Sequence, residues 1–179
     1  MEWLLRTEAV LEECRQHIDN TGSTGAEVEA FLSQYLLVVL CAEMQEEMYR
    51  VVELRAKKCG DDEICSFALA SSKKILRSVK TGELSGFVGG FGSARKGRFV
   101  EALDERTILQ YNSAVDNRHS VAHRNGAQVT LADMAEIIMA AKRVLDSALA
   151  ALIDGDAERG AEGINPHPGE KAIKGDVAD

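Results

Sequence analysis

Apolar residues recur at helical rather than alternating spacing through most of the first 153 positions. We therefore predict a first helix over roughly residues 2–18 and, after a turn at 20–25, a second helix from about 25 to 58. The second helix is longer than average, which is typical of the central spine of a bundle. Its apolar stripe consists of Leu36, Leu40, Met44, Met48, Val51 and Val52.

Glycine and capping residues divide the rest of the chain. Gly60 ends the second helix, and Asp61 can cap a third helix over about 62–79. Six glycines in residues 82–97 predict a long loop.

A fourth helical segment follows over roughly 98–123, with a break expected near Asp104. Thr130 and Asp133 then form a variant of the capping box before a final helix. The apolar stripe of that helix extends to about residue 153 and consists of Ile137, Ile138, Ala141, Val144, Leu145, Ala148 and Leu152.

The pattern predicts an all-α protein. No segment alternates with the period of a β-strand, and the two prolines, Pro166 and Pro168, lie near the end of the chain. We predict an up-and-down bundle of four to five helices over residues 1–153. Glycine, proline and charge dominate residues 154–179, so we expect a flexible tail there.

Composition narrows the class of protein. Apolar residues make up 45% and charged residues 28% of the 179 residues, as in globular proteins. The net charge of −8 argues against non-specific wrapping of nucleic acid but permits a local basic site. No signal-peptide pattern opens the chain, and the longest apolar run, residues 35–42, is too short to cross a bilayer. The four cysteines show no CxxC spacing, so we expect a cytoplasmic protein with no structural zinc, no cofactor and no membrane partner.

Residues 117–126, NRHSVAHRNG, concentrate proton-transfer and cationic groups. They hold two of the four histidines, His119 and His123, together with Arg118 and Arg124. A histidine can take a proton from a ribose 2′-hydroxyl or give one to the leaving oxygen. An arginine can hold the non-bridging phosphate oxygens. These residue types point to metal-independent cleavage of RNA.

The decamer resembles the R-x4–6-H signature of the HEPN (higher eukaryotes and prokaryotes nucleotide-binding) superfamily. Residues 33–52, SQYLLVVLCAEMQEEMYRVV, resemble the long second helix of its toxin-like and ribonuclease-like families. Residues 91–123 resemble their approach to the motif. The resemblance spans most of residues 30–150.

The HEPN resemblance implies a helical homodimer whose two motifs face each other across an RNA-binding cleft. Arg118 and His123 would be the catalytic pair, with His119 in support. The acid of the second helix would be Glu43 or Glu47, with Glu46 and Gln45 competing for that position. Such endoribonucleases are often toxins or antiphage effectors, so an antitoxin or regulatory partner is also implied.

Basic residues near the motif suggest an RNA-binding surface. Seven of them fall within residues 73–98 against one acid, and they would form an electrostatic track toward the motif. We assign Lys96, Arg98 and Arg124 to RNA binding. The seven are Lys73, Lys74, Arg77, Lys80, Arg95, Lys96 and Arg98.

Several alternatives remain open. The chain can be a non-catalytic HEPN module that dimerises or binds nucleotides or RNA. Arg118 can pair with Asp116 on a solvated face, and the basic residues can form an ordinary charged surface. His119 and His123 have the i, i+4 spacing of metal ligands but lack a third ligand nearby. Tyr111 is a conceivable acceptor if a transferase modifies the protein with AMP.

Overall fold

The computed structural model describes residues 1–25, 27–122 and 129–153, with side chains described as far as Arg118 in the second range. Within these ranges the chain forms seven helices and no strand. The all-α class is confirmed, whereas the expected count of four to five helices is wrong. The predicted tail lies outside the described residues. The helices are α1 (Leu5–Thr21), α2 (Glu27–Lys57), α3 (Asp62–Ile75), α4 (Thr81–Gly89), α5 (Ser93–Glu101), α6 (Glu105–Ala122) and α7 (Met134–Ile153).

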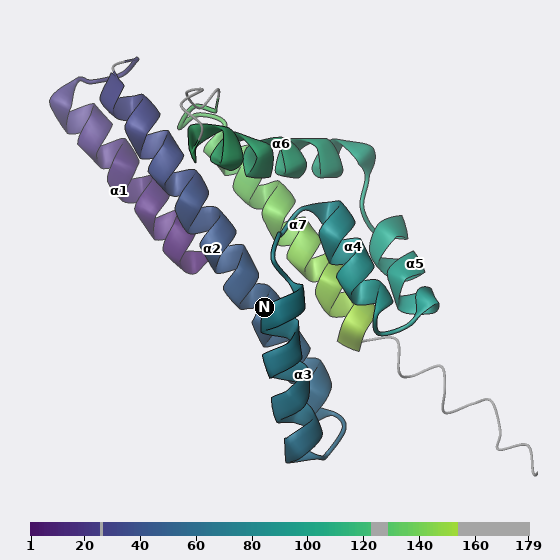
Figure 1. The fold of residues 1–179 in the computed structure, drawn as a ribbon. Coiled ribbons are helices and arrows are strands. Elements are labelled where there is room, and N and C mark those ends of the chain that lie inside the picture. Colours follow the sequence, from purple (N-terminus) through teal and green to yellow (C-terminus); the bar gives the residue numbers. More distant parts are fainter. Residues whose placement is uncertain (26, 123–128, 154–179) are drawn as a thin grey trace, which may run out of the picture.

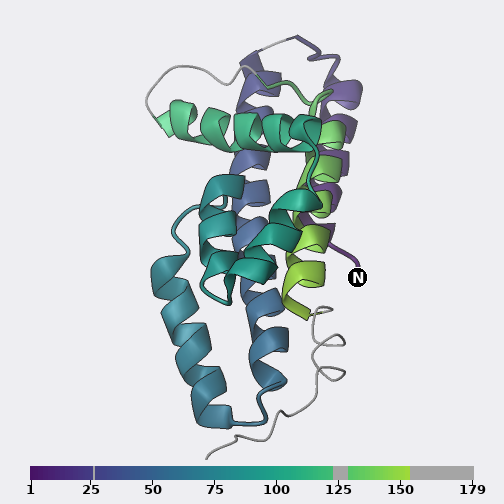
Figure 2. The same ribbon diagram turned by 90° about the vertical axis from the view of Figure 1, so that its right-hand side faces the viewer.

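Three long helices, α1, α2 and α7, lie side by side and form the body of the bundle (Figure 1). Helix α6 crosses α2 and α7 near one end of the body, and α4 and α5 cover the C-terminal half of α7 (Figure 2). Helix α3 runs back along the C-terminal half of α2, at the other end of the molecule.

The core follows the predicted apolar stripes. Every residue of the α2 stripe and of the α7 stripe is buried, so both predictions are confirmed. Tyr111, Ala114 and Val115 of α6 complete the core where that helix crosses the body. A buried face on each long helix is the main source of stability in such a bundle.

The predicted loop at 82–97 is wrong, because α4 and α5 occupy most of it. Leu84, Phe87 and Val88 of α4 and Phe99 of α5 are buried. Their burial outweighs the unfavourable helix propensity of the glycines, which costs about 1 kcal/mol for each glycine. Gly92, with φ of 123°, separates the two helices in a conformation that other residues rarely adopt.

Capping groups fix several helix boundaries. Asp61 caps α3 as predicted, since its Oδ1 accepts from Glu63 N at 2.9 Å and Ile64 N at 3.0 Å. Asp104 produces the expected break, because its Oδ1 accepts from Thr107 N at 2.7 Å and starts α6. Helix α3 ends at Ile75 rather than near residue 79.

Candidate functional site

Arg118 lies in the last turns of α6, and its side chain is exposed. The backbone remains helical from Arg118 to Ala122. The side chain of His119, and His123 and Arg124 as a whole, lie outside the described residues. The convergence of Arg118 with His123 therefore stays a prediction from the sequence.

The face of α6 that carries Arg118 is directed toward α2. Arg118 follows the fully buried Tyr111 by seven residues, which is two helical turns, so both lie on one face. Burial raises the pKa of the Cys41 thiol of α2 to about 11, and the positive charge of Arg118 opposes that rise. Arg118 is thus close enough to α2 to act electrostatically on one of its buried groups.

Three contacts hold α6 against the segment that enters α4. The Tyr111 hydroxyl donates to the Val79 carbonyl at 2.7 Å, and the Asn112 side chain bonds with Thr81. Lys80 forms an ion pair with Asp116. Tyr111 is completely buried, and burial raises its pKa well above the usual range. Its hydroxyl is therefore inaccessible to a modifying enzyme, which overturns its assignment as an AMP acceptor.

Glu43 serves α1. Its Oε2 accepts from Thr7 N at 2.7 Å and Thr7 Oγ1 at 2.5 Å, and its Oε1 accepts from Arg6 N at 3.0 Å. These donors belong to the first turn of α1, whose N–H groups have no partner within their own helix. Glu43 is buried and acts as an N-terminal cap supplied by a neighbouring helix. These hydrogen bonds involve both carboxylate oxygens of Glu43, and its part in the motif stays a prediction.

Glu47 lies one turn further along α2 and is also buried. Its Oε2 is 3.1 Å from Arg50 Nη1, yet it lacks a hydrogen bond of good geometry among the described residues. Burial raises the pKa of Glu47, Arg50 lowers it, and the charges of Glu43 and Glu46 raise it further. Glu46 is exposed and pairs with Arg6 at 3.2 Å. Glu43 and Glu46 are thus both bonded to the first turn of α1.

One residue of the predicted basic track, Arg95, is not on the surface. Arg95 is buried, and its Nη1 donates to the carbonyls of Ala151 and Leu152 at 2.9 and 2.8 Å, so it caps the C-terminus of α7. Lys96 is exposed and Arg98 is half-buried on α5. Helix α5 packs on α4 and α7.

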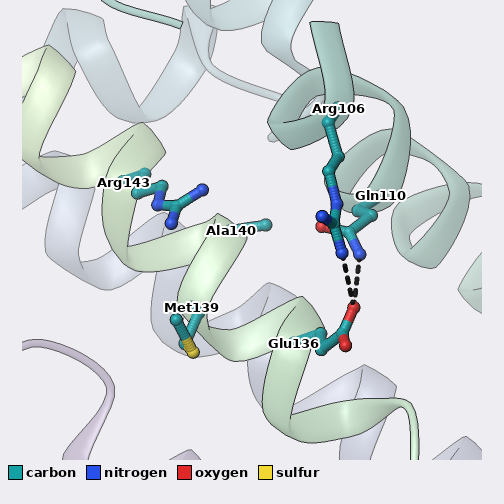
Figure 3. A pocket seen from close by; sticks show the side chains of 6 residues that line it. All are labelled: Arg106, Gln110, Glu136, Met139, Ala140 and Arg143. Carbon is teal, nitrogen blue, oxygen red and sulfur yellow. Dashed lines mark hydrogen bonds and ion pairs between the residues drawn. The ribbon is translucent and has the colours of Figure 1, made fainter. Parts of the chain in front are cut away.

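A groove lies between α6 and α7. Near the start of α6 it has a volume of about 270 Å³ and is lined by Arg106, Gln110, Glu136, Met139, Ala140 and Arg143. Figure 3 shows Arg106 and Gln110 reaching Glu136 from α6 and Arg143 extending from α7. The Glu136 Oε2 accepts from Gln110 Nε2 at 2.7 Å and from Arg106 Nη2 at 3.4 Å. Sequence reasoning missed this groove, because its residues come from separate helices.

The groove continues toward the end of α6 that carries Arg118. This second stretch has a volume of about 300 Å³. Gln110 and Glu136 belong to both stretches, and Asn117, adjacent to Arg118, lines the second. The groove therefore follows α6 for most of its length.

An exposed apolar face lies on the N-terminal half of α2. Phe31, Tyr35 and Val38 are 58%, 57% and 44% exposed. Their spacing of four and three residues puts them on one side of α2. Val38 precedes Cys41, the buried thiol on which the charge of Arg118 acts, by less than one turn of α2. A patch of exposed large apolar residues is typical of an interaction surface.

The described ranges contain no group of three or more His, Cys, Asp and Glu residues suited to a metal ion. Among the helices described, none combines the length and apolarity needed to cross a membrane. No protein-family model, curated protein or solved structure matches the chain.

Proposed function

We propose that this protein is a metal-independent endoribonuclease of the HEPN type that acts as a toxin or antiphage effector. The observation that carries the proposal is the exposed Arg118 on the last turns of α6, facing α2 and followed by the motif histidines. A guanidinium at the rim of two packed helices is accessible to a phosphate from solvent. It is also held by the rigid helix on which it stands.

The proposed reaction is an intramolecular transesterification. The ribose 2′-oxygen attacks phosphorus and loses its proton to a base, while the bond from phosphorus to the 5′-oxygen breaks. The 5′-oxygen leaves with a proton from an acid, so the products are a 2′,3′-cyclic phosphate and a 5′-hydroxyl. His123 serves as the base or the acid, and Arg118 stabilises the added negative charge on the non-bridging oxygens. His119 supports the pair by hydrogen bonding.

A homodimer would complete the site. The apolar face formed by Phe31, Tyr35 and Val38 is a suitable surface for a second subunit, since burial of exposed aromatic side chains drives association. A dimer formed through this face of α2, the helix toward which Arg118 is directed, would bring the two motifs into one cleft. The acids Glu43 and Glu47 would then support the site indirectly, through the position of α1 and α2.

The α6–α7 groove offers a path for the RNA backbone. Arg106 and Arg143 stand at its far end and Asn117 at the end next to Arg118. Lys96 and Arg98 of α5 would add phosphate contacts outside the groove lining, while Arg124 would hold phosphate near the motif. Such contacts to phosphates add affinity without sequence specificity.

Cleavage of a defined RNA tests the proposal. Wild type should cut a labelled single-stranded RNA in the presence of EDTA and leave a 2′,3′-cyclic phosphate end, detectable by mass spectrometry. Arg118→Ala and His123→Ala should each lower the rate by at least about 100-fold, the size typical of a lost acid, base or charge stabiliser. Arg15→Ala, which removes an arginine from α1, is the matched control and should cleave normally. Equal rates for wild type and His123→Ala would refute the assignment.

A growth assay tests the toxin role. Expression of wild type in bacteria should arrest growth, and Arg118→Ala should relieve the arrest at equal protein level. An antitoxin or regulatory protein should restore growth without changing the motif.

A second candidate function is a non-catalytic module that dimerises or binds nucleotides or RNA. The burial of Arg95, which removes one cation from the predicted RNA-binding surface, favours it. In that case the Arg118→Ala variant would lose RNA or nucleotide binding, and neither protein would cleave RNA.

A further inference from the structure

The outer face of α3 is apolar and exposed. Among the described helices, α3 packs extensively only on α2. Ile64, Phe67 and Ile75 are nevertheless 50%, 74% and 66% exposed. With a rotation of about 100° for each residue, these three side chains and Ser71 lie within an arc of about 80°. The middle of this stripe lies about 100° around the helix from Ser72, which is buried, so the stripe is on a different side of α3 from the buried face.

The stripe is complementary to itself when one helix is reversed. Ile64 and Ile75 stand at equal distances from the middle of the stripe, so an antiparallel copy would bring each against the other. Phe67 would meet the small Ser71 of the second copy, and the two exchange places across a two-fold axis. Such a contact is isologous, as in most homodimers.

The charges beside the stripe agree with the same orientation. Glu63 in the first turn of α3 and Lys74 in its last turn lie on the same edge of the stripe, and both are exposed. An antiparallel pair would place Glu63 within reach of Lys74 of the second copy, twice by symmetry. In a parallel two-fold pair this edge would lie on opposite sides of the contact in the two copies, so neither ion pair would form.

We propose that α3 is a self-association surface through which a second copy of this chain docks in antiparallel orientation. The surface lies at the end of the molecule opposite to the C-terminal end of α6 (Figures 1 and 2). It is therefore separate from the proposed dimer cleft and its RNA chemistry. Two short helices bury less area than the 1,200–2,000 Å² or so of a standard interface, so the association depends on protein concentration.

Sedimentation velocity over a range of concentrations tests the surface. The mass of the wild type should rise with concentration, and Phe67→Glu should raise the dissociation constant of that step at least tenfold. Phe67 is three-quarters exposed, so the variant should retain the helical circular dichroism of the wild type. Leu109→Glu, which replaces another exposed apolar residue at 70% exposure on α6, should behave as the wild type. Identical behaviour of Phe67→Glu and wild type would overturn the proposal.

Exchange of the charges tests the orientation. Glu63→Lys and Lys74→Glu should each associate at least fivefold more weakly than the wild type. An equimolar mixture of the two variants should associate more tightly than either alone, because one chain then presents only lysines and the other only glutamates. Asp61, which caps α3, and Asp62 remain in both variants. If the mixture associates no more tightly than either variant alone, the antiparallel pair is excluded. RNA cleavage by the same samples tests the ribonuclease independently.

Discussion

Glu43 and Thr7 join α2 to the start of α1 through two hydrogen bonds to one oxygen. Glu43 Oε2 accepts from both the amide and the hydroxyl of Thr7, at 2.7 and 2.5 Å. Both residues are buried. Glu43 therefore belongs to the frame that holds α1 on the bundle.

Replacement of Glu43 by alanine should lower the free energy of unfolding by about 3 kcal/mol, since buried N–H and O–H donors lose a charged acceptor. Urea denaturation followed by circular dichroism measures the change. Glu46→Ala, which removes the exposed partner of Arg6, is the control and should cost less than about 1 kcal/mol. Loss of RNA cleavage without loss of stability in Glu43→Gln would instead assign this acid to the catalytic site.

Glu47→Gln should stabilise the protein at neutral pH. Burial raises the pKa of Glu47, so the folded state holds its proton more tightly than the unfolded state does. This contribution to stability is present below the unfolded pKa, near 4.5, and is lost as pH rises through the folded pKa. The increase in the free energy of unfolding caused by Glu47→Gln should therefore be larger at pH 7 than at pH 4. Unfolding free energies of both proteins at the two pH values measure it, and an equal difference at both would show that the buried charge of Glu47 does not destabilise the fold.

Arg95→Met should destabilise the protein by about 2–3 kcal/mol, because the carbonyls of Ala151 and Leu152 lose a buried charged donor. Hydrogen exchange should show that the last turn of α7 opens more often. The neighbouring exposed lysine supplies the control, and Lys96→Met should change stability by no more than about 0.5 kcal/mol. If both variants are equally stable, Arg95 does not support α7.

The helices of the body could be predicted because their apolar stripes repeat over many turns. The α2 stripe from Leu36 to Val52 and the cap at Asp61 needed only local information. The glycine-rich stretch could not be predicted, since its helices depend on the packing of Leu84, Phe87 and Phe99 against distant parts of the chain. Local propensity is a weak guide wherever tertiary contacts decide.

The candidate site was less predictable than the fold. The position of Arg118 on α6 agrees with the expected helix before the motif. The roles of Glu43 and Arg95 depend on partners 36 and 56 residues away, and one sequence carries no signal for such pairs. Charge alone suggested a surface track, whereas Arg95 is inside the protein.

Cys41 should report the position of Arg118. In a variant in which Cys14, Cys59 and Cys65 are replaced by serine or alanine, thiolate absorbance should titrate near pH 11, since burial raises the pKa of Cys41 to about 11. Arg118→Gln should move the midpoint upward, because it removes a charge that favours the thiolate. Arg106→Gln, at the other end of α6, should leave the midpoint unchanged. An unchanged midpoint in Arg118→Gln would mean that Arg118 does not face Cys41.

The α6–α7 groove should contribute more to RNA affinity than α5 does. Arg106 and Arg143 line the groove from opposite sides (Figure 3), whereas Lys96 and Arg98 lie outside its lining. Arg106→Gln with Arg143→Gln should weaken binding of single-stranded RNA about tenfold in low salt. It should also reduce the slope of log affinity against log salt by about 1.4, at roughly 0.7 for each phosphate contact. Fluorescence anisotropy at several salt concentrations, with His123→Ala as the non-cleaving background, measures both quantities. Lys96→Gln with Arg98→Gln is the matched pair. A larger loss in that pair than in the arginine pair would move the RNA path from the groove to α5.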